Sequence, residues 1–440
     1  MKIVAFIPAK GSSERVPSKN KRVLDGDFLF LRKLKQLKRS RHITDIFLDT
    51  EDREMARMAE IIGVKVLLRD KALASNSTDG HELFVNECIQ VPDADIYIQA
   101  LCTAPFVDEK TIDRAIDALL ASPENDSLVA VTKGKQYTWI DGIPSYGVGR
   151  IPNSVDLQET IVESMSLYIV KKESLYFKKK RFGMSPILFE LSPRENIDIN
   201  YQEDLELAEA IATGDRQAEV KLFRALKSNL SSAVFSDLTK DLGLNCTVDS
   251  GVKPQIHGHV LGRAKTLYLK GLKNKKDQSD SSNKEWMGIY DALQSYDYIR
   301  AGDVIVVENE IKNRAYFGEL NAHLAVRAGA VGVLVDGVTR DLDGVQRLDL
   351  PVYARGNYCN DIKYEGTLGS INQPIIFGGI PVKNNDVIFA DRDGIVILPE
   401  EHWEEILKIA IKNTINEAQI RISAAMGVPV DSILDKHGVF

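Results

Sequence analysis

The chain has 440 residues, of which 44% are hydrophobic and 27% charged, a composition typical of folded globular proteins. Its net charge of -7 argues against charge-driven binding to nucleic acid and favours chemistry on small molecules. No apolar run reaches the roughly 18 residues of a membrane helix, and the start, MKIVAFIPAKGS, lacks the features of a signal peptide. We therefore expect a cytoplasmic protein without a membrane segment, and roughly 100 to 200 residues per domain predicts two or three domains.

Short apolar runs alternate with helix-length segments in the first half of the chain. The segments expected as strands or helices are 2–9, 28–39, 44–50, 53–63 and 64–69. This alternation is typical of an α/β fold with a largely parallel sheet. The basic stretch 32–41 carries leucines at helical spacing, so we interpret it as an amphipathic helix with a basic solvent face rather than as a nucleic-acid site.

The two halves of the sequence differ in pattern. A helix is expected at 203–212, ending at Thr213-Gly214, and the mixed-charge stretch that follows suggests a boundary at 214–230. We predict a first domain at 1–216, a linker at 217–234 and a second domain at 235–440. The second half has strand-like runs separated by glycine-rich turns, a polar surface insertion at 270–286, and a helix at 400–422.

A loop with phosphate-binding character follows the first strand, from Pro8 to Asn20. Small residues at 11–13 would let backbone N–H groups approach an anion, and Lys10, Arg15 and Lys19 supply positive charge. From the residues alone, a solvated basic turn is an equally good interpretation.

The same loop resembles the signature I-P-A-R-x-x-S-K-x-x-P-x-K-N of the acylneuraminate cytidylyltransferase family, the CMP-sialic acid and CMP-Kdo synthetases. Further matches follow in order, at VLLRDKALASN, TAPF, IPNSVDL, SLYIV and NIDINYQEDLELAE. The resemblance covers residues 1–212 and implies a Rossmann-like nucleotidyltransferase α/β sandwich with a mostly parallel sheet. It also implies transfer of CMP from CTP to the anomeric hydroxyl of a 3-deoxy-2-ulosonic acid, with release of pyrophosphate.

This resemblance implies roles for individual residues. Expected phosphate binders are Lys10, Gly11, Ser12, Ser13 and Lys19, expected CTP contacts are Asn20 and Arg69, and expected Mg2+ ligands are Asp198 and, weakly, Asn200. Lys19 and Asp198 are also expected to act in catalysis, because charge that develops on the transferring phosphoryl group needs cations.

The sequence departs from the family pattern in four places. Lys10 stands in place of an arginine, Glu14 stands where a lysine is common, Asn200 replaces the second metal-binding aspartate, and Ser164-Met165 replaces an Asn-Gly pair. With Asn200 uncharged, Glu203 or Asp204 could compensate at the metal. The departure at Ser164-Met165 leaves the identity of the sugar open.

The second half contains Glu319, then twenty residues, then Arg340-Asp341. The stretch between them predicts a helix, a turn at Gly329 and a buried strand, so Arg340 and Asp341 would lie in the loop after that strand. Arg340 could bind a carboxylate through two hydrogen bonds, while Asp341 could bind a divalent metal.

Residues 235–425 resemble the RraA-like family, which includes the class II 4-hydroxy-4-methyl-2-oxoglutarate aldolases, on the stretches AGDVIVVEN, GELNAHLAVRAGAVGVLVDGVTRD, PVYARG and NDVIFADRDGIVILPEE. The resemblance implies a swivelling α/β/α domain and metal-assisted aldol chemistry on a 4-hydroxy-2-oxo acid. Arg340 would orient the substrate, Asp341 would bind Mg2+ or Mn2+, and Glu319 would act near the metal through water.

The two resemblances suggest a bifunctional enzyme, because a 3-deoxy-2-ulosonic acid in its open-chain form is a 4-hydroxy-2-oxo acid. One half would assemble the sugar acid from pyruvate and an aldehyde sugar, and the other would couple it to CMP, as in polysaccharide precursor synthesis. In an alternative, the second half is a non-catalytic oligomerisation or regulatory module. A role as an RNA-degradation inhibitor rests on fold analogy alone. A homo-oligomer is expected, either a dimer, a trimer or a hexamer.

Overall fold

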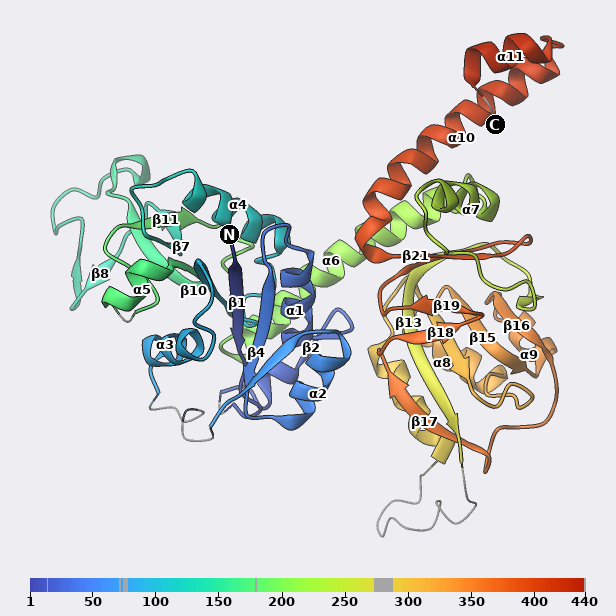
Figure 1. Ribbon diagram of the computed structural model, residues 1–440, viewed down its shortest axis with the longest axis horizontal. Coiled ribbons are helices and arrows are strands. Elements are labelled where there is room, and N and C mark those ends of the chain that lie inside the picture. Colours follow the sequence, from blue (N-terminus) through green and yellow to red (C-terminus); the bar gives the residue numbers. More distant parts are fainter. Residues whose placement is uncertain (14, 71–72, 74–77, 179, 273–287, 439–440) are drawn as a thin grey trace. The chain divides into compact units, whose positions relative to one another are not determined.

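The computed structural model describes residues 1–440 except 14, 71–72, 74–77, 179, 273–287 and 439–440 (Figure 1). The described chain divides into two compact units, Met1–Ala212 and Thr213–Phe440, which we call the N-terminal and C-terminal units. Each unit contains one large sheet covered by helices, as an α/β fold requires. Most of the polar insertion expected at 270–286 lies outside the described residues.

The N-terminal unit is built on a seven-stranded sheet with the order β11-β7-β10-β6-β1-β4-β5. The strands in that order are Pro186–Glu190, Ser127–Gly134, Thr160–Lys171, Ile96–Ala100, Ile3–Pro8, Asp45–Thr50 and Lys65–Leu68. Only β10 runs antiparallel to its neighbours among these strands. Two short hairpins add β2 (Val23–Leu24) with β3 (Asp27–Phe28), and β8 (Trp139–Ile140) with β9 (Ile143–Pro144). The predicted mostly parallel α/β fold is confirmed.

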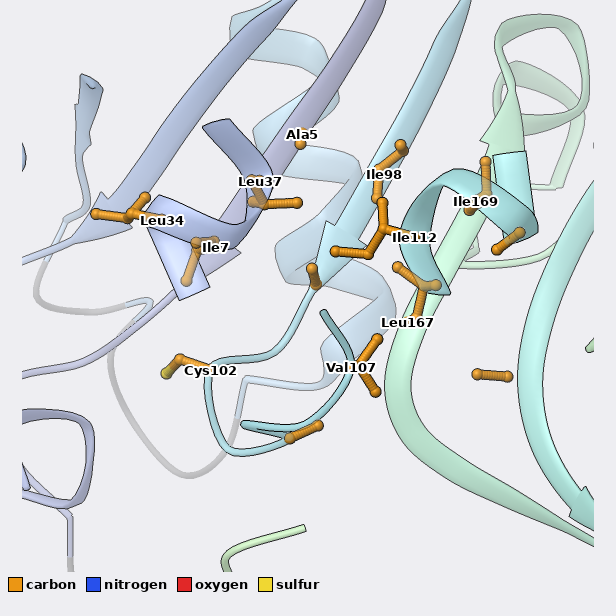
Figure 2. Packing of buried hydrophobic residues seen from close by; sticks show 14 of the residues in the cluster. Ala5, Ile7, Leu34, Leu37, Ile98, Cys102, Val107, Ile112, Leu167 and Ile169 are labelled. Atoms are coloured by element: carbon orange, nitrogen blue, oxygen red, sulfur yellow. The ribbon is translucent and has the colours of Figure 1, made fainter. Parts of the chain in front are cut away.

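Helices cover both faces of this sheet. They are α1 (Leu29–Arg39), α2 (Arg53–Ile61), α3 (Gly80–Gln90), α4 (Glu109–Leu120) and α5 (Lys172–Lys178). Figure 2 shows one side of the core, where Leu34 and Leu37 of α1 and Ile112 of α4 pack against Ile7 and Ile98 of the sheet. Helices α3 and α5 pack on the opposite face.

The basic stretch 32–41 lies mostly in α1, as the leucine spacing predicts. Its leucines Leu31, Leu34 and Leu37 are buried. Not every basic residue of this stretch lies on the expected basic solvent face, because Lys33 is only 1% exposed. Its ammonium group donates to the Val107 carbonyl, and burial lowers the pKa of Lys33 to about 7.

The C-terminal unit has a larger sheet with the order β12-β16-β15-β14-β13-β20-β21, and β17 also pairs with β13. These strands are Lys253–Ile256, Val352–Asn357, Gly332–Thr339, Asp303–Asn309, Val260–Gly271, Val387–Ala390, Ile395–Leu398 and, for β17, Gly366–Ile371. Strands β13 to β16 are parallel to one another. The separate hairpin of β18 (Ile375–Phe377) and β19 (Ile380–Val382) packs on one sheet face, and α8 (Glu319–Ala328) packs on the other.

The remaining helices are α6 (Gln202–Leu226), α7 (Ser232–Asp241), α9 (Leu342–Gln346), α10 (Trp403–Ala425) and α11 (Val430–His437). No helix in the described part of the chain is both long and apolar enough to cross a membrane.

The helix expected to end at Thr213-Gly214 instead continues to Leu226 as α6, so most of the segment 217–234 is helical in α6 and α7. Two ion pairs hold the later part of α6 to the sheet of the C-terminal unit, Arg216 with Asp303 at 3.2 Å and Glu219 with Arg263 at 2.5 Å. Gly214 lies inside α6, where a glycine destabilises a helix by only about 1 kcal/mol relative to alanine. The two ion pairs and the burial of Phe223 are sufficient to offset this cost.

Candidate functional site

Loop 9–20 leaves the sheet at the carboxyl end of β1, next to the ends of β4 and β6. The Asn20 side chain is 7% exposed and donates from Nδ2 to the Lys10 carbonyl at 2.8 Å, which fixes the start of the loop. The Gly11 N–H donates to Glu51 Oε1 at 2.8 Å. A Cβ at position 11 would lie 2.4 Å from Asp52 Oδ2, so only glycine fits there. The structure thus brings Lys10, Gly11 and Asn20 together.

Glu51 affects the expected phosphate role of this loop. The Glu51 carboxylate accepts a hydrogen bond from the Gly11 N–H. The backbone N–H that could bind a phosphate is therefore already bound to an anionic side chain. Ser12 is exposed and Ser13 is half-buried beside it. A phosphate at Gly11 would have to replace the Glu51 carboxylate.

Lys19 connects the loop to the segment around Asp198. Its ammonium group donates to the Ile199 carbonyl at 2.8 Å. Burial lowers the pKa of Lys19, while the Asp198 carboxylate acts in the opposite direction. Two residues that are 179 positions apart are therefore neighbours in one charged site, as their expected roles require.

The expected metal position has one available oxygen. Asn200 Nδ2 donates to Asp198 Oδ2 at 2.6 Å, whereas Asp198 Oδ1 is buried and has no hydrogen-bond partner among the described residues. A buried carboxylate oxygen without a partner is costly, and a hard cation such as Mg2+ would satisfy it. The described residues contain no cluster of three or more histidine, cysteine or acidic side chains suited to a metal, so other ligands would come from substrate or water.

Asp204 is not placed as a second metal ligand. Its Oδ2 accepts the backbone N–H groups of Asn200 and Tyr201, each at 2.8 Å, at the start of α6. These two bonds hold the turn that carries Asn200. The carboxylate therefore acts locally as a helix cap.

Arg69 lies in a buried network. Its guanidinium group binds both carboxylate oxygens of Asp49 at 2.9 Å, and both side chains are almost fully buried. Gln99 donates to Glu87 Oε2 at 2.6 Å in the same region. Burial, reinforced by the Asp49 carboxylate, raises the pKa of Glu87 well above its usual value. Arg69 is thus rigidly held by Asp49, and its contact to CTP stays a prediction.

A second charged group near β10 was not predicted from the sequence. Arg181 is 7% exposed, and its guanidinium lies over the Tyr168 ring at 4.9 Å. Its Nε has no hydrogen-bond partner among the described residues, and its backbone N–H donates to His81 Nδ1 at 3.1 Å. The sequence gives little indication of this group, because Arg181 directly follows three lysines and such a basic run is usually exposed to solvent.

In the C-terminal unit the structure brings together all three predicted site residues. Glu319 starts α8, and Arg340 and Asp341 follow β15. The Glu319 N–H donates to Asp341 Oδ2 at 3.3 Å, and Arg340 Nε lies 3.5 Å from the same oxygen. Asp341 has a φ of 58°, a left-handed conformation that is uncommon for a residue other than glycine. The turn is held by the Arg340 N–H, which donates to the Phe317 carbonyl at 3.0 Å.

Two glycines make room for these carboxylates. A Cβ at Gly318 would lie 2.5 Å from Asp341 Oδ2, and a Cβ at Gly344 would lie 2.4 Å from Glu319 Cδ. Neither glycine has a positive φ, so their small size is the property that matters. The two carboxylates therefore occupy positions that alanine would block.

Sequence reasoning missed two charged neighbours of this site. Arg340 also pairs with Asp361 at 2.6 Å, and Arg347 pairs with Glu319 at 3.1 Å. Asp361 reaches the site through a bridge between the loop after β16 and Ala315, which sequence spacing does not reveal. Asp341 Oδ1 makes no hydrogen bond or ion pair with the described residues, so it is the carboxylate oxygen that fits a divalent cation.

Comparisons with known proteins agree with these two units. Residues 4–225, about half of the chain, match the family model described as cytidylyltransferase, and the chain therefore belongs to the cytidylyltransferase family. Residues 232–397 match a second family model, described as aldolase/RraA. Both resemblances expected from the motifs are confirmed.

Individual relatives match one part of the chain. A Halalkalibacterium halodurans protein, provisionally assigned as a 4-hydroxy-4-methyl-2-oxoglutarate aldolase, is 33% identical over 137 residues, which are 31% of this chain and 65% of that protein. Protein DlpA of Legionella pneumophila is 25% identical over 212 residues, or 48% of this chain and 32% of DlpA. The chain thus spans less than two thirds of the length of either relative.

Two solved structures illustrate the similarity. A CMP:2-keto-3-deoxy-manno-octonic acid synthetase complexed with CTP is 13% identical, with a TM-score of 0.38 over 48% of this chain and 100% of that chain. Streptomyces coelicolor RraAS2, described as an unusual member of the RNase ES inhibitor RraA family, is 25% identical. Its TM-score is 0.39 over 46% of this chain and 96% of its own.

Proposed function

We propose that the N-terminal unit transfers CMP from CTP to the anomeric hydroxyl of a 3-deoxy-2-ulosonic acid and releases pyrophosphate. Membership of the cytidylyltransferase family supports the nucleotidyl transfer. The observation that carries the proposal within the site is the nearness of Lys19, which donates to the Ile199 carbonyl, to Asp198, whose Oδ1 is buried and unpartnered among the described residues. A cation and a metal-binding oxygen are the groups that a transferring phosphoryl group needs.

The residues of this unit would act by position and charge. Lys10 and Lys19, with the backbone and hydroxyls of Gly11, Ser12 and Ser13, would bind the triphosphate. Asp198 would hold Mg2+, with Asn200 as a weaker ligand, and the ion would supply charge stabilisation at the phosphoryl oxygens. Asn20 and Arg69 would contact the nucleotide, with Arg69 fixed in place by Asp49.

We propose that the C-terminal unit is a metal-dependent aldolase that forms or cleaves a 4-hydroxy-2-oxo acid, with pyruvate as one component. The aldolase/RraA match supports the class, and the contact of the Glu319 N–H with Asp341 Oδ2 supports a retained site. Arg340 would bind the substrate carboxylate through its guanidinium group. Asp341 would hold Mg2+ or Mn2+, which polarises the 2-oxo group when bound, and Glu319 would hold a proton through a water molecule.

The two reactions are proposed to act in sequence on one sugar acid, in the synthesis of a polysaccharide precursor. The product of an aldol addition of pyruvate to an aldehyde sugar has the 2-oxo acid group that the cytidylyl transfer requires. We further propose that the chain works as a homo-oligomer. The exposed apolar residues of the β8–β9 hairpin support this, since Trp139, Ile140 and Ile143 are 63%, 65% and 62% exposed.

The test measures each reaction separately in the full chain. With CTP, Mg2+ and a panel of six- to nine-carbon ulosonates, pyrophosphate release should require Asp198 and should be unaffected by Glu209→Gln, an exposed acid on α6. With Mg2+ but without CTP, the free ulosonates should yield pyruvate with the wild type and not with Asp341→Asn. No pyrophosphate from any ulosonate would refute the first activity. Equal pyruvate from wild type and Asp341→Asn would assign the C-terminal unit to oligomerisation or regulation instead.

A further inference from the structure

Helix α10 extends away from the sheet of the C-terminal unit, and α11 folds back along its end (Figure 1). The first turns of α10 are anchored by Trp403, Ile406 and Ala410, which are buried in the same cluster as residues of α7 and β21. Farther along, α11 packs through Ile433, and Asn416 bonds to the backbone and side chain of His437 at 3.0 Å. The two helices thus form a hairpin with one face packed inward.

The opposite face of α10 is apolar and exposed among the described residues. Ile411, Ile415 and Ile422 are 36%, 57% and 60% exposed, and Ala425 is exposed on the same side. With Ala418 they form a stripe at spacings of 4, 3, 4 and 3 residues, which we call the α10 seam: Ile411, Ile415, Ala418, Ile422 and Ala425. At 1.5 Å per residue the seam is about 21 Å long. This spacing is the pattern by which one helix packs along another.

The residues beside the seam place no like charges against each other in a helix pair. The flanking positions are Lys412, Thr414, Gln419 and Arg421. Arg421 is already paired with Glu417 at 3.2 Å on the same helix. Repulsion would arise only at Lys408, the next position of the stripe toward the N-terminus, if two parallel copies placed these lysines side by side.

We propose that the α10 seam is an interface for a second copy of this chain, whose α10 packs against it in antiparallel orientation. Ile411 then lies opposite Ile422 of the second copy, and Ile415 lies opposite Ala418 of the second copy. Each Lys408 lies opposite an Ala425, so the antiparallel arrangement avoids the lysine pair. Isoleucine opposite alanine or isoleucine keeps the two helices close along the whole seam. The α10 seam shares no residue with either candidate active site or with the β8–β9 hairpin.

Disulfide trapping tests the pairing and its direction. One full-length chain would carry Ile411→Cys and another, with a different tag, Ile422→Cys, both with Cys359→Ser because Cys359 is the exposed native cysteine and Cys88, Cys102 and Cys246 are buried. Co-expression should give a disulfide-linked dimer that contains both tags, while either chain alone should stay uncrosslinked. Ala424→Cys is the matched control, because it is exposed on a different side of α10 and should not crosslink with Ile411→Cys.

The mass of the assembly gives an independent readout. Sedimentation equilibrium of the full chain with Ile415→Asp and Ile422→Asp should show a twofold lower mass than wild type. Ile89→Asp, at a helical site that is 66% exposed on α3, should leave the mass unchanged. Crosslinking of either cysteine chain with itself would overturn the antiparallel pairing. An unchanged mass together with no mixed crosslink would overturn the interface, and would show that the seam is covered within one chain or not at all.

Discussion

The backbone N–H of Glu319 and the carboxylate Oδ2 of Asp341 lie 3.3 Å apart, although 22 positions separate the two residues in the chain. The contact joins the first residue of α8 to the loop after β15, so the two residues lie next to each other in the fold. It also leaves Asp341 Oδ1 without a partner among the described residues. The side chain of Asp341 is 46% exposed, which permits access by a metal ion and substrate.

Replacement of Asp341 by asparagine should abolish pyruvate release while the fold persists. The substitution removes the charge that would hold the metal, and we expect a loss of at least roughly 100-fold in kcat/KM. The melting temperature should change little because the side chain is half exposed. Asp343→Asn, an exposed acid two positions away, is the matched control and should retain wild-type activity. Equal activity of the two variants would contradict a role for Asp341.

Gly344→Ala should also lower pyruvate release. The new Cβ would lie 2.4 Å from Glu319 Cδ, so the Glu319 carboxylate would have to move. A displacement of about 1 Å at a reacting group can cost about 100-fold in rate. Steady-state kinetics should therefore show a reduced kcat, whereas Gly394→Ala, which would meet no atom within 4 Å, should behave as wild type. Full activity of Gly344→Ala would mean that the position of Glu319 does not matter.

The buried Arg69–Asp49 pair should dominate the stability of its part of the N-terminal unit. Asp49→Asn leaves the Arg69 charge buried without its partner, and loss of one member of such a pair costs about 3–5 kcal/mol. Urea denaturation should detect this change. Glu87→Gln should cost far less, because the raised pKa of Glu87 favours the uncharged form that glutamine resembles. Comparable losses in the two variants would show that Glu87 is charged.

Glu87 should also give the stability a defined dependence on pH. The pKa of Glu87 is raised in the folded state. Above the pKa that Glu87 has in the unfolded chain, the folded protein therefore still holds a proton that the unfolded chain has lost. The contribution is therefore complete below the unfolded pKa and is lost as the pH rises toward the folded pKa. Midpoints of urea denaturation measured from pH 4 upward should decline less steeply in Glu87→Gln than in wild type. An identical dependence of the midpoint on pH in the two proteins would contradict the raised pKa of Glu87.

Because of Lys33, we expect the stability of the protein to rise with pH at higher pH. Burial lowers the pKa of Lys33 to about 7 in the folded protein, whereas in the unfolded chain the side chain keeps its ordinary pKa of 10.5. The unfolded state thus binds more protons between these values, so stability rises with pH across this window and is lowest below pH 7. Lys33→Met should remove this rise and stabilise the protein at neutral pH. A wild-type midpoint that stays flat between pH 7 and 10 would contradict the assignment.

The sequence predicted much of the fold because local patterns and tertiary packing agree there. The apolar run at 2–9 became β1 and the leucine spacing at 28–39 became α1, with the leucines buried as expected. It failed at Gly214, where ion pairs of Arg216 and Glu219 with the sheet of the C-terminal unit extend α6 beyond the local stop signal. Contacts between residues far apart in the chain cannot be predicted from the spacing of residues in the sequence.

The candidate sites show the same limit. Arg340 and Asp341 were predicted from their place after a strand, and Glu319 from the resemblance to the RraA-like family; the structure brings the three together. Asp361 was missed because only the fold joins its loop to Arg340. In the N-terminal unit, the resemblance predicted Lys19 as a phosphate binder and Asp198 as a metal ligand, and the structure brings them close together. The fixation of Arg69 by Asp49 was not predicted, because it depends on the parallel pairing of β4 with β5.

The most direct test of the central claim, that one chain carries out two successive steps on one sugar acid, is a coupled reaction with labelled pyruvate. The full chain would be incubated with carbon-13 pyruvate, CTP, Mg2+ and a panel of aldehyde sugars, and CMP-linked products would be analysed by mass spectrometry. The account predicts a CMP-ulosonate that carries the label with the wild type. It predicts no labelled product with Asp341→Asn, which should still convert a preformed ulosonate. Absence of labelled product with every sugar, while the wild type couples a preformed ulosonate to CMP, would contradict the claim.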